Sequence, residues 1–296
     1  MRHAILGVGG VGGLMGACLA RLGHTVTLVV RAEALAKYPE QLELESAFGN
    51  FRGAVARSAD VPPCDALWLA VKATQLESAL GAVKRPEAAG AIVPLLNGID
   101  HLAPLRARCG AERVIAATIA VESERVAAGH IVHRSPFARL SVSSKGRDLL
   151  GGTVEQLQQI GFECRFVDDE ATLMWSKIVF LAPIALTSTA GDLTTGGIVG
   201  DPQWRERLES CVREVAAVAA AEGAKVDAEA VIAGMRKMPG NMRSSMQKDV
   251  AAGKAPELDA IAGPIVRGAR RHGIVVPVTE KLVATVERRA GLVESA

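Results

Sequence analysis

The feature that most constrains this chain is a glycine-rich segment, G-V-G-G-V-G, at residues 7–12. It comes at the end of an apolar run with strand character and opens a helix-like stretch, Gly10–Leu22, that stops at Gly23. A second β-rich run, Thr25–Val30, follows directly. A strand, a glycine turn, a helix and a second strand within about thirty residues form the βαβ unit in which this spacing binds a dinucleotide.

Each glycine of this segment has a physical role in such a unit. Gly7 permits the tight turn, Gly9 lets the backbone approach a pyrophosphate, and Gly12 allows close packing of helix on strand. The helix N-terminus offers free N–H groups and a partial positive charge to the phosphates. The predicted phosphate-binding residues are Gly7, Gly9, Gly10, Val11 and Gly12. The alternative is a glycine-rich turn without a ligand, and the complete βαβ context argues against it.

The residue after the second strand bears on which dinucleotide is bound. An NAD-binding unit usually places Asp or Glu there to contact the ribose 2′-hydroxyl, whereas this chain has Arg31. A guanidinium suits a 2′-phosphate because it can donate two parallel hydrogen bonds. We therefore expect NADP(H). Glu33 leaves an alternative open, in which a carboxylate contacts the ribose and Arg31 is an ordinary surface residue.

Strand-like and helical runs alternate through the first half, and further apolar strands end near Val71 and Leu96. This pattern is typical of a parallel sheet covered by helices on both faces. Residues 113–144 contain more strand-like runs, which we expect to extend or flank the sheet. Helices are predicted over residues 168–189, 202–222, 228–237, 256–271 and 278–289. The prediction is an α/β Rossmann-type domain over residues 1–167 and an all-α domain over residues 168–296.

Composition argues against several other classes of function. The chain has 34 Lys plus Arg and 32 Asp plus Glu, with 3% aromatic residues, so it offers no basic or stacking surface for nucleic acid. Its five cysteines are scattered without a C-x-x-C pair, unlike a disulfide framework or a zinc site. The N-terminus superficially resembles a signal peptide, but its glycines would weaken that helix. The apolar run 178–186 is shorter than the ~20 residues of a membrane span. We expect a cytoplasmic protein without a metal site.

Polar residues follow two strands of the predicted sheet. Lys72 comes just after the strand that ends near Val71, and Asn97 with Gly98 comes after the strand that ends near Leu96. In open α/β sheets ligands bind outside the carboxyl ends of the strands. Both positions are therefore expected near the cofactor, although each could equally be a loop residue without a ligand.

Two ionisable residues of the second half have the chemistry of a reaction centre. Lys177 lies in an apolar helical stretch, and its neighbours three and four positions away are Leu173, Met174, Phe180 and Leu181. Its side chain either extends along apolar surface to water or is buried. Burial would lower the pKa of the amine, which helps a general acid to release its proton. Glu257 begins a predicted helix, where an acidic residue is also an ordinary partner of the helix dipole.

Taken together, these motifs resemble the ketopantoate reductase (2-dehydropantoate 2-reductase) family of pantothenate biosynthesis. The resemblance covers essentially the whole chain in order. The matching segments are the glycine loop, Arg31, V-K-A-T-Q at 71–75, L-N-G at 96–98, Trp175-x-Lys177, S-S-M at 244–246 with Asp249, E-L-D at 257–259 and A-R-R-H-G-I-V-V-P at 269–277. The family combines a Rossmann domain with a helical domain, in agreement with the pattern above.

The resemblance implies a role for each matching residue. Lys177 would be the general acid that protonates a 2-oxo group as hydride arrives from NADPH, and Glu257 would assist it. Ser245 would contact the substrate, and Asn97 would lie at the nicotinamide end and contact the substrate as well. Lys72 and Gln75 would line the cofactor cleft.

The chain departs from the family pattern at two positions. Members usually carry Asn four and eight residues after the catalytic lysine, whereas this chain has Leu181 and Ala185. If these two residues line the pocket, its wall is apolar, and a branched apolar 2-oxo acid should be reduced at least as well as ketopantoate. The alternative is that both residues pack in the core.

The predicted function is NADPH-dependent reduction of a small 2-oxo acid, either ketopantoate or a relative without its distal hydroxyl. Two alternatives remain open from the sequence. One is another dehydrogenase of similar architecture, such as a 3-hydroxyacid dehydrogenase or an imine reductase. The other is a non-enzymatic NADP(H)-binding sensor on a reused fold. The sequence is compatible with a homodimer and indicates no membrane or nucleic-acid partner.

Overall fold

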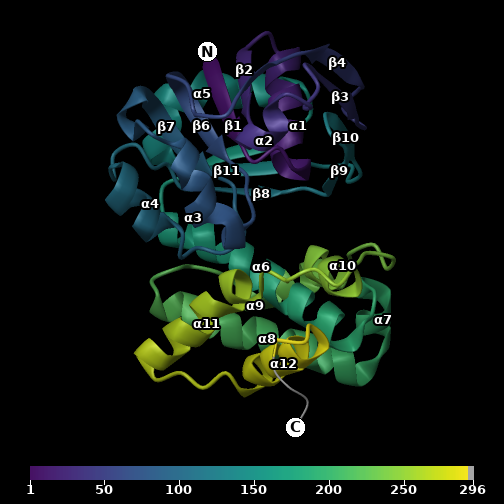
Figure 1. The fold of residues 1–296 in the computed structure, drawn as a ribbon. Helices are drawn as coiled ribbons and strands as arrows, with labels where there is room; N and C mark the ends of the chain where they lie inside the picture. The colour runs from purple at the N-terminus through teal and green to yellow at the C-terminus, as the bar shows by residue number, and fades with distance from the viewer. Residues whose placement is uncertain (293–296) are drawn as a thin grey trace. The chain divides into compact units, whose positions relative to one another are not determined.

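The computed structural model describes residues 1–292, and Figure 1 shows its helices and strands. The chain separates into two compact units, with the second beginning in the main at Ala171. The predicted domain boundary after Val167 lies close to this point. The short segment Asn97–Asp100 groups with the second unit although the sequence around it belongs to the first.

The first unit is built on a parallel sheet of five strands in the order β5-β2-β1-β6-β7. These strands are β1 (Arg2–Leu6), β2 (Thr25–Val29), β5 (Ala56–Ser58), β6 (Cys64–Leu69) and β7 (Ala89–Pro94). In the centre of the sheet, Leu6 is paired with Val29 on one side and with Leu69 on the other. The carboxyl ends of these strands therefore lie at one edge, and the predicted Rossmann-type sheet is confirmed.

Two smaller sheets complete the strands of this unit. One has the order β4-β3-β10-β9 and the other the order β12-β11-β8. Their strands are β3 (Gln41–Glu45), β4 (Phe51–Ala54), β8 (Ala117–Ala120), β9 (Ser123–Ala127), β10 (His130–His133), β11 (Arg139–Ser143) and β12 (Glu163–Val167). Of the residues predicted as strands over 113–144, Val114 forms one parallel bridge with Ile92 of β7, and the named strands lie in these two smaller sheets, where β9 pairs antiparallel with β10 and β8 with β11.

Helix α1 (Gly10–Arg21) packs against β1 and β2 and also against the sheet that contains β3 and β10. Its buried residues, among them Leu14, Met15 and Leu19, form much of the apolar core of the unit. The other α-helices are α2 (Ala32–Leu35), α3 (Leu76–Ala79), α4 (Leu102–Cys109) and α5 (Arg147–Gln159). Short 3-10 turns are η1 (Ala73–Gln75), η2 (Leu80–Ala82), η3 (Pro86–Ala88) and η4 (Ser144–Gly146).

From residue 171 to residue 292 the chain contains helices and no strand, so the predicted all-α second half is confirmed over the described residues. The helices are α6 (Glu170–Gly191), α7 (Thr195–Gly200), α8 (Pro202–Ala221), α9 (Ala228–Met235), α10 (Ser245–Ala251), α11 (Leu258–His272) and α12 (Pro277–Arg289). The predicted helix ranges do not include α7 and α10. Each short helix has a side-chain cap, in which Thr194 accepts from Gly197 N and Ser244 from Gln247 N.

Helix α6 forms the apolar centre of the second unit. It has 22 residues and a mean hydropathy of 1.4 in its most apolar window, so its length and composition would allow a membrane span. However, 67% of that window is buried inside the protein, where Ile178, Val179 and Leu186 pack in the core. Packing in a protein core therefore explains its apolar sequence.

A buried histidine connects two strands of the parallel sheet. His3 of β1 is 1% exposed, and its Nδ1 accepts a hydrogen bond from Trp68 Nε1 of β6 at 3.1 Å. Burial lowers the pKa of His3 to about 3, and the nearby charges of His24 and the N-terminus lower it further. The ring is therefore neutral in the folded protein at ordinary pH.

This ionisation predicts a pH-dependent stability. The pKa of histidine in an unfolded chain is about 6.5, so protonation favours unfolding. The folded protein has its full stability with respect to His3 above pH 6.5, where the ring is neutral in both states. The free energy of unfolding then decreases as the pH falls towards 3. At pH 5 the loss from His3 should be about 2 kcal/mol. In His3→Gln, which keeps an oxygen acceptor for Trp68, this contribution to the pH dependence of urea unfolding should vanish. His130→Gln, at a partly exposed position, should keep the contribution of His3. If the free energy of unfolding changed equally with pH in the unmodified protein and in both variants, this assignment to His3 would be contradicted.

Candidate active site

The glycine segment has the geometry that its sequence requires. Gly7 has a φ of 98°, and a Cβ there would lie 2.6 Å from Val71 N. A Cβ at Gly12 would lie 2.0 Å from the Gly7 carbonyl oxygen, so only glycine lets the helix approach the strand this closely. At Gly9, by contrast, a Cβ would meet no atom within 4 Å. The turn is thus packed on its inner side, while at Gly9 it is open to an approaching ligand.

The N-terminus of α1 has the properties of an anion site. No side chain caps this helix, and its first turn contains no acidic residue. The N–H groups of Gly10, Val11 and Gly12 have no acceptor within the helix, as at every helix start. Their partial positive charge favours an anion such as a phosphate. The geometry therefore fits the pyrophosphate of a dinucleotide, and the assignment of these residues as ligands stays a prediction.

Other predicted cofactor residues follow the neighbouring strands. Arg31 lies just beyond β2, with 87% of its side chain exposed, and its Nε is 3.7 Å from Glu33 Oε1. An exposed pair of this kind contributes little free energy, so Arg31 can turn to an anionic ligand at small cost. Lys72 is half-buried at the start of η1, and Gln75 is exposed at its end. Because β1, β2 and β6 are parallel neighbours, the glycine turn, Arg31 and Lys72 follow the same edge of the sheet.

Two residues that contact the glycine segment were missed by the sequence analysis. Ser123 Oγ donates to the Gly10 carbonyl at 3.0 Å, and an Arg125 guanidinium nitrogen donates to the Val8 carbonyl at 3.4 Å. Both come from β9, more than a hundred residues further along the chain. No local motif indicates this approach, because it depends on the pairing of strands outside the parallel sheet.

In the second unit, two predicted site residues meet directly. Asn97 Nδ2 donates a hydrogen bond to Glu257 Oε2 at 3.1 Å. Glu257 is 9% exposed and immediately precedes α11, yet its side chain makes no capping hydrogen bond with that helix. Capping is therefore not the role of this carboxylate, which instead takes part in a polar cluster.

The segment 97–100 is held firmly against α11. Gly98 has a φ of 85°, and a Cβ there would lie 2.3 Å from the Ala260 carbonyl oxygen. Ile99 packs against the apolar core of the second unit, and Asp100 accepts hydrogen bonds from Arg267 at 2.7 and 3.2 Å. This anchoring fixes Asn97 beside Glu257.

Lys177 joins this cluster from α6. Burial lowers the pKa of Lys177 to about 8, and the charge of Glu257 opposes that shift by raising it. The side chain is only partly exposed, and its amine is desolvated. Lys177, Glu257 and Asn97 thus combine a cation that can release its proton near neutral pH, a carboxylate that interacts with it, and an amide that orients the carboxylate.

The predicted substrate-contacting residues have different surroundings. Leu181, one turn beyond Lys177, is partly buried against the core of the second unit. Ala185 is 1% exposed and belongs to that core, as expected from the alternative in which this residue packs in the core. Ser245 is exposed in the first turn of α10, while Ser244 caps that helix. The substrate contacts of all three residues stay predictions.

Comparison with known proteins identifies the class of this site. The family described as Ketopantoate reductase PanE/ApbA matches residues 3–144, and the one described as Ketopantoate reductase PanE/ApbA C terminal matches residues 170–290. The 2-dehydropantoate 2-reductase of Caulobacter vibrioides is 31% identical over 299 residues, which cover 97% of this chain and 98% of that protein. These matches define an oxidoreductase that acts on a CH–OH/C=O couple. The chain belongs to the ketopantoate reductase family.

Solved structures agree with this assignment. A PanE/ApbA family ketopantoate reductase from Ralstonia eutropha JMP134 has a TM-score of 0.85 and 28% identity, with 99% of each chain covered. A ternary structure of D-mandelate dehydrogenase with NADH and anilino(oxo)acetate has a TM-score of 0.87 and 20% identity, again with 99% of each chain covered. The second likeness concerns the fold alone.

The polar cluster predicts how Lys177 titrates. In the full chain with isotopically labelled lysine, NMR should show one lysine with a midpoint near 8, absent in Lys177→Ala. Because Glu257 raises this pKa, Glu257→Gln should move the midpoint to lower pH. Asp259→Asn, which removes a nearby carboxylate paired with Arg267, should leave the midpoint in place. An ordinary lysine midpoint of about 10.4 in the unmodified protein would contradict the burial of this amine.

Proposed function

We propose that this protein is an NADPH-dependent reductase of a small 2-oxo acid, with Lys177 as the general acid. The observation that carries the proposal is the cluster of Lys177, Glu257 and Asn97 in a chain that belongs to the ketopantoate reductase family. The bound cofactor would supply the hydride that reduces the 2-oxo carbon. The residues of this chain would bind and orient the substrate and move the proton.

The proton step follows from the ionisation of Lys177. A pKa of about 8 keeps the amine mostly protonated at pH 7 and makes release of the proton easier than from an ordinary lysine. As negative charge develops on the 2-oxo oxygen, the ammonium donates its proton and becomes a neutral amine. Glu257 stabilises the ammonium before this step, and Asn97 holds the Glu257 carboxylate through the 3.1 Å hydrogen bond.

The proposed role of Lys177 predicts a large effect on turnover. Lys177→Ala should lose about 10²–10⁴-fold in kcat, the usual contribution of general acid–base catalysis. In the unmodified enzyme kcat/KM should fall as the pH rises through about 8, because the donating ammonium is lost. Steady-state reduction of 2-oxo acids, followed by consumption of NADPH, measures both quantities. Lys237→Ala, at an exposed lysine, is the matched control. Near-normal turnover in Lys177→Ala would overturn the mechanism.

The exposed Arg31 predicts the choice of cofactor. NADPH should be preferred over NADH, and Arg31→Ala should weaken NADPH binding by about one to two decades, the loss of one charge-assisted contact. NADH binding should remain nearly unchanged, because it lacks the 2′-phosphate. Fluorescence titration with both cofactors measures this, and Glu33→Ala tests the neighbouring carboxylate. Equal losses for both cofactors in Arg31→Ala would indicate a structural role instead.

The residue one turn beyond Lys177 predicts substrate preference. Leu181 would place an apolar side chain where the family usually has an amide, and a buried hydroxyl without a partner costs about 1–3 kcal/mol. We therefore expect 2-oxoisovalerate to be reduced with a kcat/KM equal to or above that for ketopantoate. Leu181→Asn should reverse this order. Ala185 is left unchanged in this test, because an amide at that core position would disturb packing. A strong preference of the unmodified enzyme for ketopantoate would reject this account of the pocket.

A further inference from the structure

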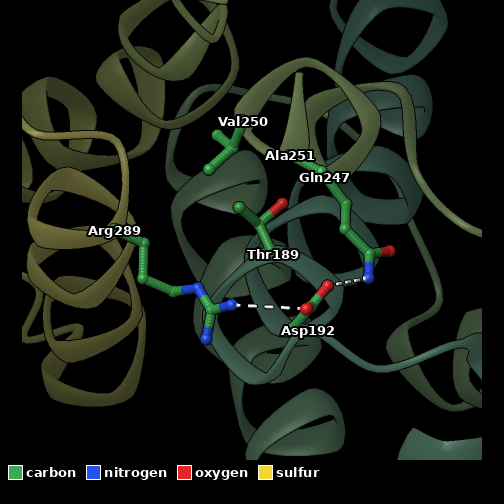
Figure 2. A pocket seen from close by; sticks show the side chains of 6 residues that line it. All are labelled: Thr189, Asp192, Gln247, Val250, Ala251 and Arg289. Carbon is green, nitrogen blue, oxygen red and sulfur yellow. Dashed lines mark hydrogen bonds and ion pairs between the residues drawn. The ribbon is translucent and has the colours of Figure 1, made fainter. Parts of the chain in front are cut away.

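Many arginines of this protein pair with a carboxylate. In the small cavity at the end of α6, a guanidinium nitrogen of Arg289 lies 3.5 Å from the carboxylate of Asp192, as Figure 2 shows. Next to β9, Arg134 donates to Glu124 at 2.7 Å. Arg125, which also belongs to β9, differs from these residues because its contacts are with uncharged groups of the glycine turn and its surroundings.

The side chain of Arg125 faces the start of α1. Arg125 is paired with Ile131 of β10, and directly paired residues of antiparallel strands lie on the same face of a sheet. Ile131 packs against α1 so closely that a Cβ on Gly13 would lie 2.3 Å from its Cδ1. On this face, an Arg125 guanidinium nitrogen donates to the Val8 carbonyl at 3.4 Å. Strand β9 therefore brings a cation to the turn that is predicted to bind the cofactor.

The same guanidinium also contacts the segment that follows β2. It lies beside the hydroxyl of Tyr38, a buried residue whose oxygen accepts a hydrogen bond from Gly129 N at 3.3 Å. Burial raises the pKa of Tyr38, and the hydrogen bond from Gly129 and the charge of Arg125 lower it in part. The hydroxyl is therefore neutral and, like the Val8 carbonyl, does not neutralise Arg125. The Arg125 residue is exposed, and these contacts occupy few of its five N–H groups.

This position matches the place of a ribose 2′-substituent in a Rossmann domain. The ribose lies between the glycine turn and the residue after the second strand, where an arginine accommodates a 2′-phosphate. Arg31 follows β2, and Arg125 contacts both the glycine turn and the segment beyond Arg31. A phosphate monoester has a charge of about −2 near pH 7 and three acceptor oxygens. One guanidinium binds two of these oxygens, which leaves an acceptor and part of the charge for a second cation.

We propose that Arg125 is a second cationic contact for the ribose 2′-phosphate of NADP(H). Arg31 binds the phosphate from the end of β2, and Arg125 binds it from β9. The inference rests on the cofactor choice in the proposed function and adds a residue that determines this choice. The alternative is that Arg125 only holds the glycine turn in place, which would affect NADPH and NADH equally.

The test compares ligands with and without the 2′-phosphate by calorimetric titration of the full chain. The probes are adenosine 2′,5′-bisphosphate against adenosine 5′-monophosphate, and NADPH against NADH. Arg125→Met should weaken binding of the 2′-phosphorylated probe in each pair by about tenfold or more and leave the other nearly unchanged. Arg125→Lys should restore part of the loss, because it keeps the charge without the fork of donors. With Arg31→Ala added to Arg125→Met, the preference for NADPH should be smaller than in either single variant.

Two matched variants separate the proposed contact from an effect on the turn. Arg134→Met removes an exposed arginine that is paired with Glu124, and it should bind every probe as the unmodified chain does. Ser123→Ala removes the hydroxyl of β9 that donates to the Gly10 carbonyl. Any loss in Ser123→Ala should be equal for NADPH and NADH, because both cofactors use the turn.

The outcomes distinguish this proposal from the proposed function. Equal losses of NADPH and NADH in Arg125→Met would overturn the proposal and assign Arg125 to the turn. Losses in Arg31→Ala without a selective loss in Arg125→Met would also overturn it, and the proposed use of NADPH would stand. Because binding is measured without turnover, a selective loss in Arg125→Met would support the proposal even if the unmodified protein reduced no 2-oxo acid, which would reject the proposed reaction alone.

Discussion

The close approach of the glycine turn to the neighbouring strand end is the constraint on which the first unit depends. At Gly7 the backbone passes so near Val71 that a side chain would overlap it, and at Gly12 the helix lies against the Gly7 carbonyl. This contact sets where α1 begins and leaves its N-terminal N–H groups uncapped at the carboxyl edge of the sheet. The same steric requirement thus fixes the packing of α1 and the position of the candidate phosphate site.

In the second unit, the corresponding constraint is electrostatic. Desolvation of the Lys177 amine disfavours its charged form and lowers its pKa, and the charge of the Glu257 carboxylate raises the pKa again in part. Asn97 donates a hydrogen bond to this carboxylate, and Gly98 lets segment 97–100 pack closely against α11. A segment that follows the parallel strand β7 therefore helps to hold the carboxylate whose charge raises the pKa of Lys177.

The sequence predicts those parts of the molecule that depend on local spacing. The glycine turn, the parallel sheet and the long helices each carry a periodic or steric signal within some thirty residues. The sequence does not predict the contact of Ser123 with Gly10, because strand pairing far along the chain brings them together. The resemblance indicated Asn97 and Glu257 as site residues, but their hydrogen bond spans 160 positions and appears only in the structure. The short helix α7 was missed because glycines occupy half of its residues, and α10 was missed because seven residues carry little periodic signal.

The last turns of α6 show how an apolar helix accommodates polar side chains. The Thr187 hydroxyl donates to the Pro183 carbonyl at 2.7 Å, and Ser188 bonds to the Ala185 carbonyl and to Ser244. Such bonds to a preceding carbonyl are the usual way for a hydroxyl to be satisfied inside a helix. Thr189, the next residue, is as deeply buried and makes no such bond within the described protein. The helix therefore satisfies two of three consecutive buried hydroxyls, and burial of the third without a partner costs free energy.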